Sequence, residues 1–194
     1  KLSVLTSLKA LNFGKVAIFT TQKSYLRNLV AESVKQSGLL LGVPSAFDKS
    51  DNTYMSNLSE FFKEYVGDNF ELVESCRLGI LYHHGDLPQV VREKVEAAIK
   101  KNFASLLICT STLAEGVNLP VDTLVLHTVR RFNPESEKLE YLTKREVKNI
   151  VGRAGRAGFS NQGIVISANP AEFSYLRNVI DDVGIEEIES YFYQ

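Results

Sequence analysis

The residues best suited to chemistry lie in one stretch, 149–158 (NIVGRAGRAG). Arg153 and Arg156 are three positions apart, so on a helix both would lie on one face. Almost all of their neighbours are glycine or alanine, which leaves room for a large anionic group beside that face. A guanidinium offers several donors in a rigid, permanently charged fork that suits phosphate oxygens. The alternative is a helix that ends on glycine and carries two solvated arginines.

Small polar or imidazole side chains follow three apolar runs that are typical of short buried strands. They are Thr20 and Thr21 after Val16–Phe19, His83, His84 and Gly85 after Gly79–Tyr82, and Thr110, Ser111 and Thr112 after Leu106–Cys109. In a parallel sheet the carboxyl ends of the strands meet at one edge, where ligands bind. Hydroxyls and imidazoles suit a phosphate backbone lying across that edge, although hydroxyls also cap helices. The series favours a surface that handles phosphates.

The composition describes one soluble globular domain of 194 residues, of which 44% are hydrophobic and 23% are charged. The net charge of −1 excludes a global basic field, so any nucleic-acid surface must be local. Residues 127–158 carry eight Lys or Arg and four Glu, a net of +4, whereas residues 159–194 carry one Arg and six acids, a net of −5. Cys76 and Cys109 have no CxxC spacing, which favours a reducing compartment. No apolar run spans a bilayer and no signal peptide is visible, so the predicted location is cytoplasmic, or nuclear in a eukaryote, with no membrane partner.

Hydrophobic periodicity predicts the remaining elements. Helices are expected over Leu2–Phe13, Gln22–Gln36, Lys144–Val151, Ala171–Ile180 and Ile185–Phe192, and strands over Thr123–Leu126 and Ile164–Ile166. Ser45–Ser56 has the composition of a loop, and a capping box of Asn57 and Glu60 predicts the start of the next helix. Asp86 is predicted to cap a further helix, with Pro88 in its first turn.

Short apolar strands that alternate with helices predict an α/β fold whose mainly parallel sheet is covered by helices on both faces. The whole chain is interpreted as a single domain. Residues 1–13 are expected to form an entry helix, 43–76 a variable helical insert, and 168–194 an acidic helical tail toward a following domain.

Four segments resemble the motifs of superfamily 2 helicases, in the same order. Ile18–Lys23 (IFTTQK) resembles motif IV, and Tyr82–Leu87 (YHHGDL) is similar to motif IVa. Thr110–Pro120 (TSTLAEGVNLP) looks like motif V in its Ski2-like form, and Gly152–Arg156 (GRAGR) resembles motif VI. Each match is weak alone, but together they cover about residues 14–167 and resemble the C-terminal RecA-like lobe of a Ski2-like DExH-box helicase. The resemblance implies a RecA-like three-layer sandwich.

The resemblance also implies roles for individual residues. One strand of single-stranded DNA or RNA would lie against Thr20, Thr21, His84, Gly85, Thr110 and Thr112. Gly116, Asn118 and Gly152 would lie near the nucleotide at the cleft between two lobes. Arg153 and Arg156 would reach a triphosphate bound on the other lobe, with Arg156 as the arginine finger. Asn149 takes the place of the usual, longer Gln, and Tyr82 stands where a plainer apolar residue is expected.

The sequence contains no G-x-x-x-x-G-K-[ST] phosphate loop and no Asp-Glu pair after a strand. ATP with Mg²⁺ would therefore be bound mainly by the N-terminal RecA-like lobe of the same full-length protein. The chain is interpreted as one motor lobe of an ATP-dependent helicase or translocase, inactive alone. The alternative is a non-catalytic scaffold that grips nucleic acid or a protein, and the presence of Arg153 and Arg156 argues against it.

Three other features of the sequence are predicted to have no role in a functional site. No metal site is predicted, because His127 is the only further imidazole beside His83 and His84 and no Cys or carboxylate completes a ligand spacing. Arg130 and Arg131 could grip nucleic acid, but their position beside Asn-Pro favours a solvated loop. The stripe of Phe61, Phe62 and Tyr65 is interpreted as core rather than as a base-stacking platform.

Overall fold

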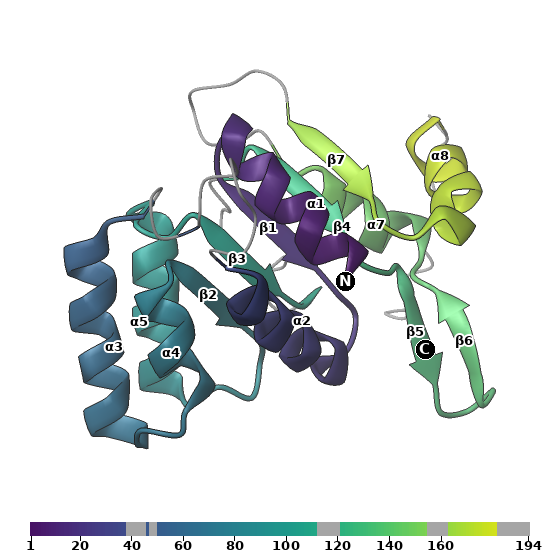
Figure 1. Ribbon diagram of the computed structural model, residues 1–194. Coiled ribbons are helices and arrows are strands. Elements are labelled where there is room, and N and C mark those ends of the chain that lie inside the picture. The colour runs from purple at the N-terminus through teal and green to yellow at the C-terminus, as the bar shows by residue number, and fades with distance from the viewer. Residues whose placement is uncertain (38–45, 47–49, 112–120, 155–162, 182–194) are drawn as a thin grey trace, which may run out of the picture.

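A parallel β-sheet forms the centre of the molecule (Figure 1). The computed structural model describes residues 1–37, 46, 50–111, 121–154 and 163–181. The sheet strands in this part are β1 (Val16–Phe19), β2 (Ile80–His83), β3 (Leu106–Cys109), β4 (Thr123–Leu126) and β7 (Ile164–Ser167). Their order is β2-β3-β1-β4-β7, and every pairing is parallel. All residues of β1 to β4 are buried, so the sheet needs cover on both faces.

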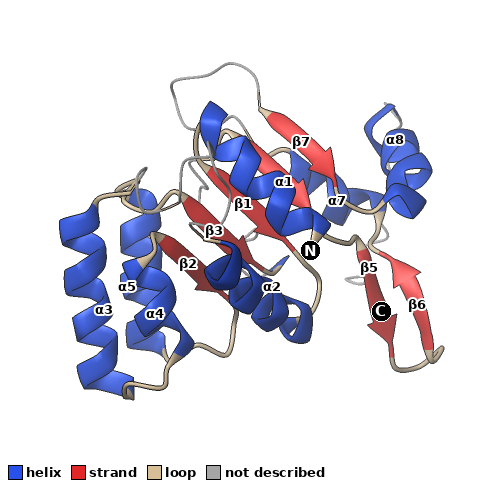
Figure 2. Ribbon diagram, viewed as in Figure 1, coloured by secondary structure: helices blue, strands red, loops and turns tan. Residues whose placement is uncertain are grey.

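Helices cover the two faces of the sheet (Figures 1 and 2). α1 (Leu2–Ala10) and α2 (Lys23–Gln36) lie over one face, and α7 (Lys144–Val151) lies over the other. α5 (Gln89–Lys100) joins β2 to β3, a crossover opposite in direction to the one from β1 to β2. Because such crossovers are right-handed, α5 lies on the face opposite α2. This arrangement confirms the predicted α/β fold with a parallel sheet between two helical layers.

The other elements lie at the margins of the sheet. α4 (Glu71–Arg77) packs on β2 and α2, and α3 (Asn52–Val66) packs on α4 (Figure 1). The short 3₁₀ helices are Leu11–Phe13 and Pro170–Glu172, and α8 (Phe173–Asp181) follows the second of them. None of the helices in the described ranges is long and apolar enough to cross a membrane.

A β-hairpin stands apart from the main sheet (Figure 2). β5 (Arg130–Asn133) and β6 (Lys138–Tyr141) pair in antiparallel fashion, with Arg130 opposite Tyr141 and Arg131 opposite Glu140. The prediction that Arg130 and Arg131 form a solvated loop is therefore wrong. All four residues of β6 are exposed, so the hairpin lacks the buried apolar runs of the main sheet, although Lys138–Tyr141 (KLEY) alternates polar and apolar residues as a strand does.

The element bounds agree with most predictions. The strands at Val16–Phe19, Leu106–Cys109 and Thr123–Leu126 and the helix at Lys144–Val151 have the predicted ends. β2 begins and ends one residue later than predicted, and β7 ends one residue later. The helix expected over Ile185–Phe192 lies outside the described residues.

Two predicted caps are wrong. α3 begins at Asn52, inside the predicted loop, because the Asp51 carboxylate accepts the Tyr54 N–H at 2.9 Å. Asn57 is an exposed residue within α3, so it caps nothing. α5 has Pro88 at its N-cap and no side-chain cap, and Asp86 instead pairs with Lys23 on α2.

The aromatic stripe of α3 is only partly core. Phe62 is fully buried, Phe61 is packed against the core, and Tyr65 is 53% exposed. The Phe61 and Tyr65 rings are stacked with their centroids 5.7 Å apart, and the Lys94 ammonium lies over Phe61. The predicted core position is therefore confirmed for Phe61 and Phe62 and wrong for Tyr65.

Candidate nucleic-acid interface

Thr20, His84 and Thr110 lie side by side at the carboxyl edge of the sheet, where β1, β2 and β3 end. The parallel ladder continues for one residue beyond the strands. The Thr20 N–H donates to the Cys109 carbonyl at 3.0 Å, and the Thr110 N–H donates to the His83 carbonyl at 3.3 Å. The structure thus brings together three residues that are distant in sequence, since Thr20 and Thr110 are 90 positions apart. We refer to Thr20, His84 and Thr110, with the adjoining Thr21 and Gly85, as the strand-end row.

His127 extends this edge on the other side of β1. Its N–H donates to the Phe19 carbonyl at 2.9 Å, which places it beside Thr20. Its Nδ1 lies 2.7 Å from the Ser3 hydroxyl, and its ring meets Tyr25 edge-on at 5.6 Å. His127 was not predicted as part of this edge, although it directly follows the predicted strand Thr123–Leu126, as Thr20 follows β1.

The members of the row differ in accessibility. Thr20 is fully buried, and its Oγ1 has no hydrogen-bond partner among the described residues. Thr110 and His84 are 6% and 8% exposed, whereas Thr21 and Gly85 are half-buried. A buried hydroxyl without a partner is uncommon and calls for an explanation such as a ligand or an ordered water. Thr21 and Gly85 are therefore the most accessible members of the row.

Hydrogen bonding fixes the orientation of His84. Its Nδ1 accepts the Asp86 N–H at 3.2 Å, which assigns the proton of the neutral imidazole to Nε2. Burial lowers the pKa of His84, and the nearby Lys23 and Arg27 lower it further. The ring stacks on Tyr82 with the centroids 5.8 Å apart and the planes 11° from parallel. His84 is therefore a neutral donor at physiological pH.

Tyr82 links this site to α4. It is 1% exposed, and its hydroxyl donates to the Glu71 carboxylate at 3.0 Å. Burial, and after it the negative charge of Glu71, raises the pKa of Tyr82. A phenol here supplies both the surface on which His84 stacks and a donor for Glu71, which a plain aliphatic residue would not.

His83 points away from the row. Its Nε2 lies 3.0 Å from the Glu96 carboxylate on α5, and its Nδ1 has no partner in the described ranges. Burial lowers the pKa of His83, although the hydrogen bond to Glu96 raises it. Within the described residues, no group of three or more His, Cys, Asp or Glu side chains is placed to hold a metal ion.

Arg153 lies in a turn directly after the C-terminal end of α7, and we call Gly152–Arg153 the arginine-bearing turn. A capping box of Thr143 and Glu146 starts this helix, and it ends at Val151. The Arg153 N–H donates to the Ile150 carbonyl at 3.2 Å in the turn that follows. The premise that Arg153 lies on a helix face is therefore wrong, because Gly152 already ends the helix. Asn149 is exposed on α7, and Gly152 and Arg153 are half-buried.

The row and the turn lie at opposite edges of the sheet. Ala154 forms a parallel bridge with Val121, which precedes the amino end of β4, whereas the row lies at the carboxyl ends. The predicted site residues Thr112, Gly116, Asn118 and Arg156 lie outside the described residues.

Glu172 was missed by the sequence analysis. It is 2% exposed and accepts the Thr128 hydroxyl at 2.7 Å, the Val129 N–H at 2.7 Å and the Asn169 amide at 2.9 Å. It thereby holds the segment after β7 against the segment between β4 and β5. Thr128 and Val129 are more than 40 residues from Glu172 in sequence, so no local sequence pattern predicts these hydrogen bonds.

The helicase conserved C-terminal domain model matches residues 48–158, which is more than half of the chain. The chain is 28% identical to the ATP-dependent DNA helicase Hel308 of Thermoplasma acidophilum over 161 residues, covering 77% of this chain and 23% of that protein. It is 32% identical to the DExH-box ATP-dependent RNA helicase DExH13 of Arabidopsis thaliana over 160 residues, covering 80% of this chain and 7% of that protein. It is 39% identical to the antiviral helicase SKI2 of Saccharomyces cerevisiae over 88 residues, covering 45% of this chain and 7% of that protein.

The matched part of the chain covers only a fraction of its curated relatives, between 7% and 25% of the length of three of them. The matched region includes β2, β3, β4, α7 and the strand ends at His84 and Thr110. The parallel α/β sheet is the RecA-like architecture that this match implies. The chain belongs to the helicase conserved C-terminal domain family, as the second RecA-like lobe of a Ski2-like member of helicase superfamily 2.

Proposed function

We propose that this chain is the second motor lobe of an ATP-dependent helicase or translocase, and that the strand-end row binds the backbone of one nucleic-acid strand. The observation that carries the proposal is the alignment of donors at neighbouring strand ends, with the neutral His84 beside Thr110. Hydroxyl, imidazole and backbone N–H donors suit phosphate oxygens, which carry no sequence information. The row accordingly binds without base specificity, with Thr20, Thr21, His84, Gly85, Thr110 and Thr112 as its contacts.

The proposed nucleotide-facing residues are Asn149, Gly152, Arg153 and Arg156, together with Gly116 and Asn118. The turn after α7 suits a triphosphate, because Arg153 lies between the small residues Gly152 and Ala154 and is half-buried. Bound ATP with Mg²⁺ would supply the free energy of phosphoryl transfer. The task of Arg156, supported by Arg153, is to neutralise negative charge at the phosphate that a partner lobe holds. Asn149 lies one turn earlier on α7, and its amide would orient polar groups near that phosphate.

We further propose that these 194 residues do not hydrolyse ATP without an N-terminal RecA-like lobe. The support is the absence of a phosphate-loop sequence, whose backbone N–H groups cradle phosphates in such enzymes. An arginine that acts from a second lobe cannot hold ATP by itself, so activity requires both lobes.

Phosphate release by the isolated chain and by the full-length protein, with and without single-stranded nucleic acid, tests this function. We expect turnover only in the full-length protein and an increase on addition of DNA or RNA. Robust turnover by the isolated chain would refute the two-lobe argument. A full-length protein that binds single strands but releases no phosphate would favour the non-catalytic scaffold.

A further inference from the structure

The β5–β6 hairpin lies on the path between the strand-end row and the arginine-bearing turn. Its first strand begins three residues after His127, and its second strand leads through Leu142 and Thr143 into α7. The Leu142 N–H donates to the Val129 carbonyl at 2.8 Å, which closes the base of the hairpin.

One side of the hairpin is tied to the row. The Thr21 hydroxyl donates to the Arg130 carbonyl at 2.6 Å, so the residue next to Thr20 holds the first residue of β5. The Arg130 guanidinium lies over the Tyr141 ring at 5.1 Å and donates to the Leu139 carbonyl at 3.3 Å, which joins β5 to β6. These contacts link Thr21 to both strands of the hairpin.

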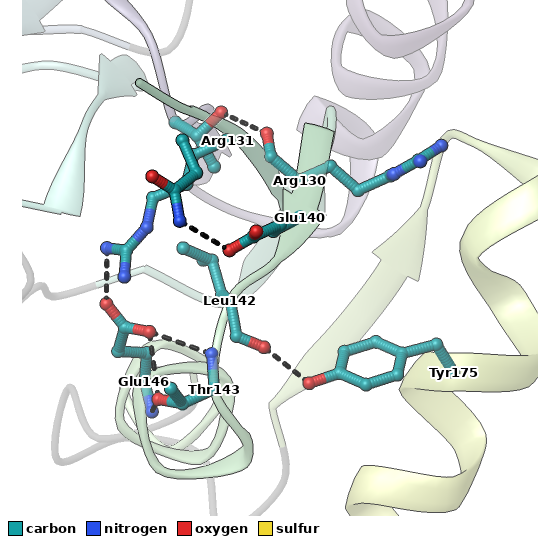
Figure 3. A network of polar contacts seen from close by, with 9 residues as sticks. Arg130, Arg131, Glu140, Leu142, Thr143, Glu146 and Tyr175 are labelled. Carbon is teal, nitrogen blue, oxygen red and sulfur yellow. Dashed lines mark hydrogen bonds and ion pairs between the residues drawn. The ribbon is translucent and has the colours of Figure 1, made fainter. Parts of the chain in front are cut away.

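The other side of the hairpin is tied to α7 through the carboxylate of Glu146 (Figure 3). Glu146 Oε1 accepts a hydrogen bond from the Arg131 guanidinium at 2.8 Å. Glu146 Oε2 accepts the Thr143 N–H and the Thr143 hydroxyl, each at 2.8 Å. Glu146 thus completes the N-terminal cap of α7 and also binds Arg131 of the hairpin.

The helix α7 continues the connection to the turn. Its eight residues span about 12 Å, from the cap at Thr143 to the Gly152–Arg153 turn. Ala154, next to Arg153, forms a parallel bridge with Val121, so the turn lies beside the amino end of β4. A short helix that moves as a rigid unit would carry a shift of the cap to Arg153.

We propose that the Arg131–Glu146 ion pair couples nucleic-acid binding at the strand-end row to the position of the arginine-bearing turn, with Arg131 and Glu146 as positioning residues. This inference rests on the proposed function, because it concerns how the two proposed sites communicate. The route runs from Thr21 through Arg130 and the hairpin to Arg131, then through Glu146 and α7 to Arg153. Coupling requires an element that both sites can displace, and the hairpin contacts Thr21 of the row directly and reaches the turn through Glu146 and α7.

The expected effect is modest, because the pair is partly exposed. The Arg131 and Glu146 side chains are 52% and 33% exposed, and water weakens such pairs. Loss of the pair should reduce nucleic-acid-stimulated turnover by roughly fivefold to tenfold, the lower part of the range of ordinary coupling between sites.

The test uses the full-length protein with Glu146→Gln, Arg131→Gln and the double variant. Gln at the third helical position retains the capping box, so Glu146→Gln removes the charge while it keeps the start of α7. Arg177→Gln is the matched control, since Arg177 pairs with Asp181 at 3.4 Å within α8 and both side chains are more than two-thirds exposed. ATP turnover is measured with and without single-stranded nucleic acid, and strand affinity is measured by titration on the same preparations.

The proposal expects each single variant to lose stimulated turnover while unstimulated turnover and strand affinity stay within about twofold of the parent protein. The double variant should be no worse than either single variant, because the second change removes nothing further. Three results would each overturn the proposal. The first is a double variant that loses the product of the two single losses, the second is an equal loss of unstimulated turnover, and the third is the same loss in Arg177→Gln. If the parent protein shows no stimulation by nucleic acid, the proposed function fails and this inference fails with it. Normal stimulation in every variant overturns the inference alone.

Discussion

Thr20→Val exchanges a buried hydroxyl for a methyl group of nearly the same shape. Thr20 is fully buried, and its Oγ1 has no partner among the described residues, whereas its N–H keeps the bond to Cys109 in either case. An unpaired buried polar group costs about 1–3 kcal/mol. The substitution should therefore raise the free energy of unfolding by about 1 kcal/mol or more, which corresponds to a rise in Tm of about 2–4 °C for a chain of this size.

The same substitution should weaken binding of single-stranded nucleic acid. If the Thr20 hydroxyl donates to a phosphate in the complex, its loss removes a hydrogen bond to a charged group, worth about 1.5–3 kcal/mol at most. We expect the Kd of the full-length protein to rise by at least about threefold, because the remaining contacts of the row compensate in part. Thermal unfolding of the chain and fluorescence titration of a labelled strand measure the two effects.

Thr123→Val provides the control. Thr123 Oγ1 is also buried without a partner in the described structure, but Thr123 begins β4 at the opposite edge of the sheet. It should stabilise the chain to a similar extent and leave the Kd unchanged. A lower free energy of unfolding for Thr20→Val would show that its hydroxyl has a partner such as an ordered water. An unchanged Kd would remove Thr20 from the interface and leave it as a core residue.

Three further outcomes are expected. Arg156→Ala in the full-length protein should reduce ATP turnover by at least about a hundredfold with little change in ATP affinity, as expected of a transition-state contact; near-normal turnover in steady-state kinetics would transfer the role to Arg153. Tyr82→Phe removes the donor to Glu71 and should lower the free energy of unfolding by about 0.5–1.5 kcal/mol in urea titrations, whereas no change would mean that this hydrogen bond adds nothing to stability. Burial is the main cause that lowers the pKa of all three histidines, so the unfolded chain binds more protons than the folded chain below the unperturbed value of about 6.5. Stability should therefore fall as the pH drops below about 6.5, and thermal unfolding that shifts upward on this acidification would contradict the assignment.

Most of the sheet was predictable because β1 to β4 are fully buried runs. Val16–Phe19 and Leu106–Cys109 are apolar at every position and are followed by polar groups, so both their extent and their shared edge follow from the sequence. The hairpin was not predictable in this way, since Lys138–Tyr141 is exposed throughout and Arg130 is held by contacts with Tyr141 and Thr21 that are not local.

The candidate site was predictable in position but not in detail. The strand ends at Thr20, His84 and Thr110 follow from the rule that carboxyl ends of parallel strands share an edge. Their burial does not follow from it, nor does the use of the Thr21 hydroxyl by Arg130. The start of α3 was misplaced because Asp51, Asn57 and several Ser residues are all plausible caps, and tertiary packing decides among them.

The strand order also determines when the sheet can begin to form as the chain is synthesised. β1 pairs only with β3 and β4, and β2 pairs only with β3, so no pairing in the described sheet is possible before Leu106 has been made. About 90 residues separate Val16 from its first partner, which at a synthesis rate of about 5–20 residues per second is a delay of several seconds. α1 packs against β1, so it is placed to cover the apolar strand Val16–Phe19 during that delay. We expect α1 to limit aggregation of the nascent chain before it becomes part of a layer of the finished fold.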